Sequence, residues 1–293
     1  MHATSTRIQT EHVARRLFLV GASRSGTTLL QVLLASHPSI HTFPETAFFI
    51  SAVGRGRRRL LAELGLTTGK EYRIVERFLK RIAREDLLST YPRRPFLFRT
   101  AVDGFVRLLD RLTVEASKEI WVEKTPRHFR YIGMIRRFVP SSQVVHMIRD
   151  GRDVVASIYH RAVSFPDEFG RQRHLSYGID LWNRAIEASI QYLGKPNHVY
   201  VVYEQLVAQP RRVLRHVCGE IGIAYDPHML STTQQTAHRA LLSREAWKAN
   251  VTKMPEPRPS KFQQLFDHET QRKISSSLNL RAYDEIKAAL SYV

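Results

Sequence analysis

Short runs of consecutive apolar residues alternate along the chain with longer segments in which apolar positions recur every three or four residues. Runs that are apolar at successive positions are typical of parallel strands covered on both faces. They lie at residues 17–20, 120–122, 143–148 and 198–203. The segments with helical spacing are 27–36, 71–88, 98–117, 128–138, 151–163, 175–193 and 204–221. Strands that alternate with helices predict an α/β fold in which helices flank a central parallel sheet.

Two proline-containing stretches interrupt this pattern. PRRPFLF, near residue 92, separates two predicted helices, and MPEPRPSKF at 254–262 precedes a final helical segment at about 264–291. Neither resembles a flexible interdomain linker. We therefore expect one domain over residues 1–293, with a core at about 17–221 and a C-terminal loop and helical segment at about 222–293.

A glycine-bracketed turn joins the first predicted strand to the first helix in LFLVGASRSGTTLLQVLL, residues 17–34. Gly21 and Gly26 frame four residues, as in the phosphate-binding motif G-x-x-x-x-G-K-[ST]. Thr27 replaces the lysine of that motif, and Arg24 supplies the positive charge inside the loop. Backbone N–H groups and the helix dipole at such a turn attract an anion. The alternative is an ordinary turn with two glycines, but SRSGTT favours a phosphate loop on a P-loop-like, three-layer fold.

A second candidate anion site lies in QVVHMIRDGRDVVASIYHR, residues 143–161. Arg149 follows a predicted strand, and Ser157 and Arg161 are four residues apart on the next predicted helix, so they share a face. Two guanidinium groups and a hydroxyl could bind a further phosphate. A solvated helix start with an Arg/Asp pair is the alternative.

The charge of the chain also points to an anionic partner. Lys and Arg number 45 against 27 Asp and Glu, a net charge of +18. Nucleic acid, an acidic membrane surface or a polyanionic ligand would each fit. No helix-turn-helix, zinc or RNP pattern accompanies the basic runs at 55–59, 93–94 and 136–137, which disfavours nucleic acid. Cys218 is the sole cysteine and reads as a buried helix position. The polar N-terminus and the lack of an 18-residue apolar run predict a cytoplasmic protein.

Four motifs in the same order resemble the sulfotransferase family: SRSGTTLLQVLLASHPSIHTFPET, WVEKTPRH, IRDGRDVVASIYHR and VYVVYEQLVAQPRRVL. That family transfers a sulfuryl group from 3′-phosphoadenosine 5′-phosphosulfate (PAPS) to an acceptor hydroxyl or amine, leaving adenosine 3′,5′-bisphosphate. The resemblance implies in-line transfer here to a hydroxyl of an alcohol, a sugar or a phenol such as tyrosine. The resemblance covers about residues 17–221 and is closest to the branch with protein-tyrosine sulfotransferases and bacterial stand-alone enzymes. Secretory members of that branch carry a membrane anchor and cysteine pairs that this sequence does not show, so a Golgi-type role does not follow.

The resemblance implies a role for each matching residue. Arg24 would contact the 5′-phosphosulfate, Glu45 would be the general base, and Lys124 would stabilise the departing oxygen. The remaining nucleotide contacts would be Ser25, Gly26, Thr27, Thr28, Arg149, Ser157, Arg161 and Tyr203, with Ser243 and Lys248 aligned only loosely. A sulfuryl group carries less negative charge than a terminal phosphoryl group, so we expect no metal.

Each assignment has a simpler competitor. Glu45 fits a helix cap, Lys124 a solvated charge after a strand, and Tyr203 a core residue. Core or surface positions are favoured over a catalytic role for the nearby histidines, which are His128, His146 and His160.

Other functions and the acceptor stay open at this point. A nucleotide kinase or NTPase would need the loop lysine that is absent, and a non-catalytic nucleic-acid-binding protein is supported by the charge alone, without a recognisable binding motif. The acceptor should enter through residues 46–118 and 164–175. An acidic peptide, anionic polysaccharide, glycolipid or small hydroxylated metabolite would fit, and so would contact with a membrane surface. The sequence does not indicate an oligomeric state.

Overall fold

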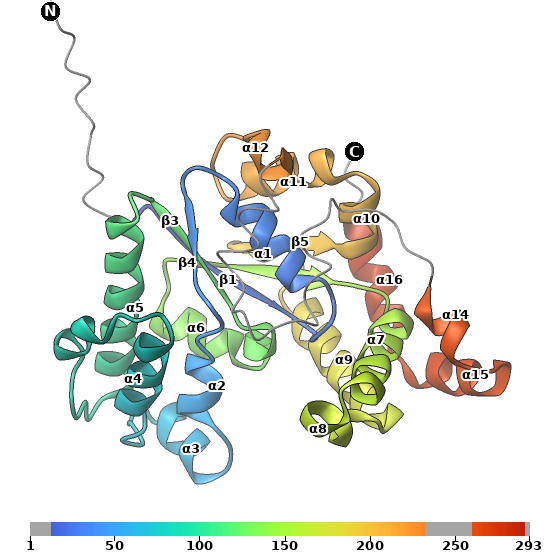
Figure 1. The fold of residues 1–293 in the computed structure, drawn as a ribbon, viewed down its shortest axis with the longest axis horizontal. Helices are drawn as coiled ribbons and strands as arrows, with labels where there is room; N and C mark the ends of the chain where they lie inside the picture. The colour runs from blue at the N-terminus through green and yellow to red at the C-terminus, as the bar shows by residue number, and fades with distance from the viewer. Residues whose placement is uncertain (1–12, 232–259, 291–293) are drawn as a thin grey trace, which may run out of the picture.

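A five-stranded sheet forms the centre of the molecule in a computed structural model that describes residues 13–231 and 260–290 (Figure 1). The strands are β1 (Arg15–Gly21), β2 (Ile40–Thr42), β3 (Ile120–Lys124), β4 (Ser142–Ile148) and β5 (His198–Val202). Their order is β2-β3-β1-β4-β5, and every neighbouring pair is parallel. The predicted parallel α/β sheet is therefore confirmed. All carboxyl ends of the strands lie at one edge, where α/β proteins place their ligands.

Fifteen α-helices and three short 3₁₀ helices in the described ranges surround the sheet. The α-helices are α1 (Thr27–Ala35), α2 (Phe48–Val53), α3 (Arg57–Glu63), α4 (Glu71–Arg81), α5 (Phe98–Glu115), α6 (Ile132–Phe138), α7 (Gly151–Ser164), α8 (Pro166–Phe169), α9 (Leu175–Ile190), α10 (Tyr203–Ala208), α11 (Pro210–Glu220), α12 (His228–Ser231), α14 (Lys261–Leu265), α15 (His268–Ser277) and α16 (Leu280–Ala289). The 3₁₀ helices are η1 (Glu85–Thr90), η2 (Pro126–Tyr131) and η3 (Gly170–Gln172). No helix in these ranges is long and apolar enough to span a bilayer.

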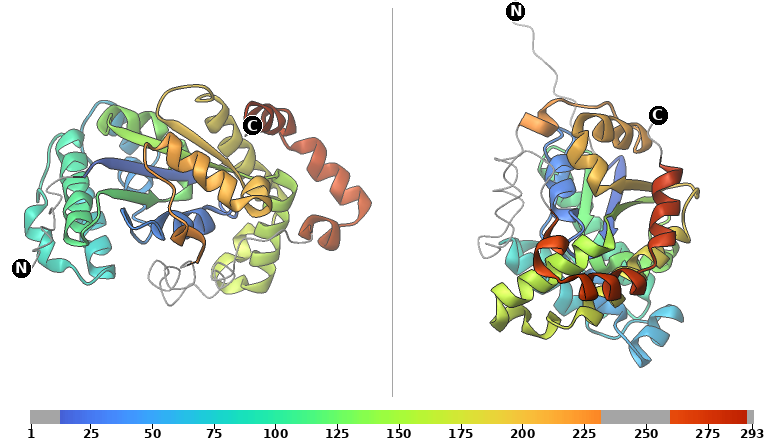
Figure 2. Two further views of the ribbon diagram at one scale, coloured as in Figure 1. Left: turned by 90° about the horizontal axis from the view of Figure 1, so that it is seen from above. Right: turned by 90° about the vertical axis from the view of Figure 1, so that its right-hand side faces the viewer.

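Both faces of the sheet are covered, which explains why its strands lack a polar alternation. Leu17 and Leu19 of β1 pack into one apolar cluster with α1, α11 and α12. Phe18 and Val20 point to the other face, into clusters with α2, α4, α5 and α6 and with α7, α9 and α16. Figure 1 shows α1, α11 and α12 above the sheet and α6 and α9 below it, and the two turned views in Figure 2 show the same layers. The three-layer expectation holds.

Several element boundaries differ from the predicted ones. The helix expected at 71–88 ends at Arg81, and Ala83 adopts a positive φ of 53° before η1 begins. The helix expected at 204–221 is two helices, because Pro210 starts α11 and cannot donate a backbone hydrogen bond inside a continuous helix. The final segment is three helices instead of one. The short elements β2, α2 and α3 lacked a detectable pattern.

Candidate active site

The first anion loop lies at the carboxyl edge of the sheet, between the end of β1 and the start of α1. Arg24 and Gly26 have positive φ angles of 74° and 96°, so the chain turns sharply and the backbone enters α1 without a side-chain cap. Uncapped N–H groups at the first turn of a nine-residue helix are available to an anion. Ser25 and Thr27 are buried, whereas Thr28 is half-buried.

Three arginines from different parts of the sequence gather beside this loop. Arg24 donates from Nε to Ser157 Oγ at 3.2 Å, and Arg149 donates from Nη1 to the Arg24 carbonyl at 3.1 Å. Burial, followed by the charges of Arg161 and Arg149, lowers the pKa of Arg24 to about 10. The structure thus brings the predicted 5′ and 3′ contacts together in one group of positive charges, the arginine clamp (Arg24, Arg149 and Arg161).

The clamp has unused hydrogen-bond donors. The Nε atoms of Arg149 and Arg161 are buried and have no hydrogen-bond partner. Arg161 is held by Gln172, which accepts from its Nη2 at 2.6 Å, and by the Phe169 ring, 4.2 Å from its guanidinium carbon. Buried donors are satisfied in nearly all native proteins, so unpartnered guanidinium nitrogens indicate a place for an anionic ligand.

Tyr203 packs against the clamp. Its ring lies 4.2 Å from the Arg149 guanidinium carbon, a cation–π contact, and is half-buried. A Cβ added to Gly26 would approach the same ring to 2.5 Å. Tyr203 therefore bridges the phosphate loop and the Arg149 side chain.

Glu45 and Lys124 form an ion pair next to the clamp, with 2.5 Å between Glu45 Oε1 and Lys124 Nζ. Lys124 is 2% exposed and Glu45 38% exposed, so the lysine is buried and the carboxylate faces accessible space. Neither simple alternative fits, because Lys124 is not solvated and the helix after Glu45 begins at Phe48 with Ala47 as its cap. Burial lowers the pKa of Arg161, and the Glu45 carboxylate is close enough to oppose that shift.

A buried carboxylate holds the segment that carries Glu45. Glu123, 1% exposed, accepts from Thr46 Oγ1 at 2.8 Å, from Thr125 Oγ1 at 2.6 Å and from the Thr46 backbone N–H at 3.3 Å. Its other oxygen contacts His128 Nδ1 at 3.1 Å. Burial alone would raise the pKa of Glu123, but the charge of His128 and these hydrogen bonds outweigh it and hold the pKa below its usual range.

Sequence reasoning did not single out Glu123, although a signal was present. Two charged residues, Glu123 and Lys124, end an otherwise apolar strand, and both are buried. Side chains of consecutive strand residues point to opposite faces, so each needs its own partner. Gln31 was missed as well: from α1 it donates to Thr42 Oγ1 at 2.8 Å and to the Phe43 carbonyl at 2.9 Å. The Glu45 segment is therefore fixed on both sides.

The remaining predicted residues have simple outcomes. His128 and His146 are buried and His160 is exposed, so their interpretation as core or surface residues is confirmed. Cys218 is buried on α11, as expected. Ser243 and Lys248 lie outside the described residues.

The site can therefore bind and transfer an anionic group. It combines backbone donors, three guanidinium groups and a carboxylate beside an ammonium group. Such donors stabilise charge that develops on oxygen atoms in a transition state, and the carboxylate can take a proton from a nucleophile.

Comparison with known proteins agrees with this geometry. The profile of a family described as "Sulfotransferase family" matches residues 16–227. Protein-tyrosine sulfotransferase A of Caenorhabditis elegans is 23% identical to the chain over 252 residues, which cover 80% of this chain and 55% of the worm protein. The chain thus spans about half the length of this curated relative.

Solved structures share the fold. The sulfotransferase domain of the Synechococcus PCC 7002 olefin synthase superposes with a TM-score of 0.60 at 19% identity, covering 92% of this chain and 96% of that domain. Mouse sulfotransferase SULT7A1 complexed with PAP superposes with a TM-score of 0.57 at 10% identity, covering 95% and 89% of the two chains. Because the family profile extends from the phosphate loop to beyond Tyr203 and covers most of the chain, the protein belongs to the sulfotransferase family of enzymes.

Proposed function

We propose that the protein transfers a sulfuryl group from PAPS to an acceptor hydroxyl, with Glu45 as the general base. The observation that carries this proposal is the Glu45–Lys124 ion pair, whose carboxylate is close enough to Arg161 of the arginine clamp to act on its charge. The clamp and the start of α1 would hold the two phosphate ends of the donor. This positioning would account for much of the catalysis, because sulfuryl transfer is taken to proceed like phosphoryl transfer through a loose, in-line transition state.

The ion pair can supply a group for each end of the transfer. The acceptor oxygen attacks sulfur, and its proton passes to Glu45. The bond between sulfur and the bridging oxygen of the 5′-phosphate breaks, and Lys124 stabilises the charge left on that oxygen. Adenosine 3′,5′-bisphosphate is then released. The ion pair supports these roles because both side chains reach the same volume.

Nucleotide binding tests the first half of the proposal. Adenosine 3′,5′-bisphosphate should raise the melting temperature without magnesium, and ATP should do so less. Arg149→Ala should weaken this binding by about 10- to 100-fold, since one charge-assisted hydrogen bond contributes about 1.5–3 kcal/mol. Arg272→Ala is the matched control, because Arg272 is an exposed arginine on α15 and is not one of the clamp arginines. Stronger, magnesium-dependent stabilisation by ATP would favour the kinase alternative instead.

Turnover tests the second half. Glu45→Gln should leave bisphosphate binding near the wild-type value while sulfuryl transfer from labelled PAPS to a panel of acceptors falls by about 10²–10⁴. Equal turnover in the variant and the wild type would remove Glu45 as the base. The same panel identifies the acceptor class, with acidic peptides, anionic polysaccharides, glycolipids and hydroxylated metabolites as its arms.

A further inference from the structure

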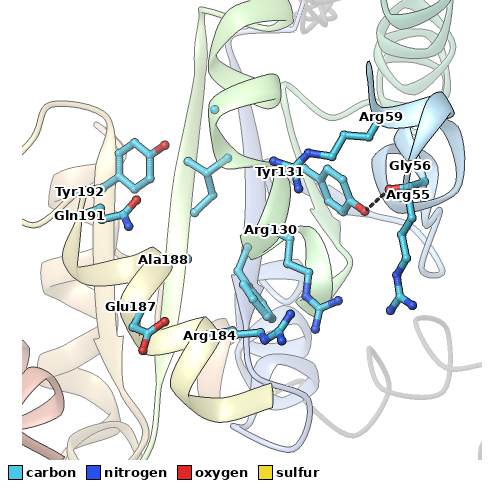
Figure 3. Close-up of a pocket in the computed structure, with 14 residues that line it drawn as sticks. Arg55, Gly56, Arg59, Arg130, Tyr131, Arg184, Glu187, Ala188, Gln191 and Tyr192 are labelled. Atoms are coloured by element: carbon cyan, nitrogen blue, oxygen red, sulfur yellow. Dashed lines mark hydrogen bonds between the residues drawn. The ribbon is translucent and has the colours of Figure 1, made fainter. Parts of the chain in front are cut away.

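A second basic cavity lies outside the arginine clamp. Its volume is about 700 Å³, and it is lined by the loop between α2 and α3, by η2 with the start of α6, and by α9 (Figure 3). Tyr131 donates from its hydroxyl to the Gly54 carbonyl at 3.4 Å, which ties the α2–α3 loop to η2. None of the clamp arginines lines this cavity.

The charge of the cavity wall is strongly one-sided. Its lining includes Arg55, Arg59, Arg130 and Arg184, against the single carboxylate of Glu187. Figure 3 shows the side chains of Arg130 and Arg184 reaching toward each other, with that of Arg55 extending beside them. Burial, followed by the charges of Arg127 and Arg184, lowers the pKa of Arg130, and Arg55 acts in the same direction.

Three of these four positive charges lack a counterion in the part of the chain that the structure describes. Arg59 pairs with Glu63 at 2.8 Å, but in the described parts of the chain no carboxylate lies within ion-pair distance of Arg55, Arg130 or Arg184. Arg130 Nε is buried without a hydrogen-bond partner, and its guanidinium carbon lies 5.5 Å from the Phe129 ring. Arg130 is half-buried, so its unpartnered Nε favours an anion as a partner. Arg55 and Arg184 are exposed and add positive charge at the mouth of the same cavity.

We propose that Arg55, Arg130 and Arg184 form a second anion-binding site, which takes a phosphate or sulfate group. Guanidinium groups suit such tetrahedral anions because each can donate two parallel hydrogen bonds. The site is close in sequence to the catalytic pair: α2 starts three residues after Glu45, and η2 starts two residues after Lys124. The anionic group could be part of the acceptor or a separate small anion. Anion binding at this site depends on neither PAPS nor sulfuryl transfer, and only its assignment to the acceptor rests on the proposed function.

Pyrophosphate is the probe for this site. Calorimetric titration is done with adenosine 3′,5′-bisphosphate at saturation, so that the clamp is occupied. We expect one pyrophosphate to bind per chain, and Arg55→Gln and Arg184→Gln each to weaken this binding by about 10-fold or more. Both residues are exposed, so the variants should fold, and Arg272→Gln is a control with the same change of charge.

Three results would overturn the proposal. One is pyrophosphate affinity in the Arg55→Gln/Arg184→Gln double variant equal to that of Arg272→Gln. The second is binding that is lost in Arg149→Gln but retained in Arg184→Gln, because that pattern would assign the pyrophosphate to the clamp. The third is the absence of any pyrophosphate binding in the wild type.

A turnover assay then separates the two sources of the anion. If the group belongs to the acceptor, pyrophosphate should compete with the acceptor and raise the KM for the acceptor. The increase in this KM that pyrophosphate causes should be smaller in Arg184→Gln than in the wild type. If a free anion occupies the site, pyrophosphate should change kcat without competing. A pyrophosphate effect of either kind that is smaller in Arg184→Gln than in the wild type supports the site. An effect of the same size in both proteins contradicts it.

Discussion

Gly26→Ala should damage the phosphate loop in two separable ways. The φ of Gly26 is 96°, where a residue with a Cβ costs about 1–2 kcal/mol. The new Cβ would also lie 2.5 Å from Tyr203 Cδ2 and 3.0 Å from Met147 Cε. Tyr203 Cδ2 belongs to a rigid ring, so the whole ring must move, and overpacking of this kind costs about 1–3 kcal/mol. The free energy of unfolding should therefore fall by about 2–5 kcal/mol.

Movement of Tyr203 should also weaken donor binding. The ring lies 4.2 Å from the Arg149 guanidinium carbon, so its displacement shifts a clamp residue. Loss of one charge-assisted hydrogen bond would lower the affinity for adenosine 3′,5′-bisphosphate by about 10-fold or more. Urea denaturation measures the first effect and calorimetric titration the second.

Gly194→Ala isolates the backbone contribution. Gly194 has a φ of 72°, and a Cβ built there meets no atom within 4 Å. This control should lose only about 1–2 kcal/mol and bind the bisphosphate normally. If Gly26→Ala were as stable as Gly194→Ala and bound the bisphosphate equally well, packing of Tyr203 against the loop would contribute neither to stability nor to donor binding, and the reasoning would be refuted.

Three further predictions concern buried groups. Glu123→Gln should lower the free energy of unfolding by about 3 kcal/mol in urea denaturation, because an amide cannot accept all the hydrogen bonds made to the carboxylate. The control Glu220→Gln, at an exposed position, should change this free energy by less than about 0.5 kcal/mol, and equal losses in the two variants would contradict the prediction. Burial, then the charge of Lys118, lowers the pKa of His41 to about 4, so as the pH drops below about 6.5 the imidazole is protonated in the unfolded chain but not in the folded one, and the free energy of unfolding falls. Urea denaturation at about pH 7.5 and 5.5 should show that His41→Asn reduces this fall by about 1 kcal/mol, and an unchanged fall would refute the assignment. Burial, then the charge of Asp226, raises the pKa of the Cys218 thiol to about 11. At about pH 8 a thiol reagent should therefore label the native protein at least about 100-fold more slowly than the unfolded chain, and similar labelling rates would show that this thiol is accessible.

Local sequence was enough to predict four of the five strands and the elements that carry the anion loop. Parallel strands covered on both faces need apolar side chains in both directions, so residues 17–20 and 143–148 were recognisable as strands. The phosphate loop was recognisable because strand, glycine-bracketed turn and helix are adjacent in the chain. Short elements such as β2 and α3 escaped prediction because three to seven residues are too few for a periodic pattern.

Only the tertiary structure decided how distant side chains meet. Glu45 and Lys124 are 79 residues apart, and parallel strands bring both to the carboxyl edge of the sheet. The same packing buries the neighbouring Glu123 and brings the hydroxyl groups of Thr46 and Thr125 close enough to donate hydrogen bonds to it. The second basic cavity likewise depends on α9 packing against η2, since no sequence pattern joins Arg184 to Arg55. The sequence by itself determined which groups could bind an anion, because backbone turns and residue types are local. Which charges share one low-dielectric space, and which find no counterion there, depends on contacts that form only when the chain folds.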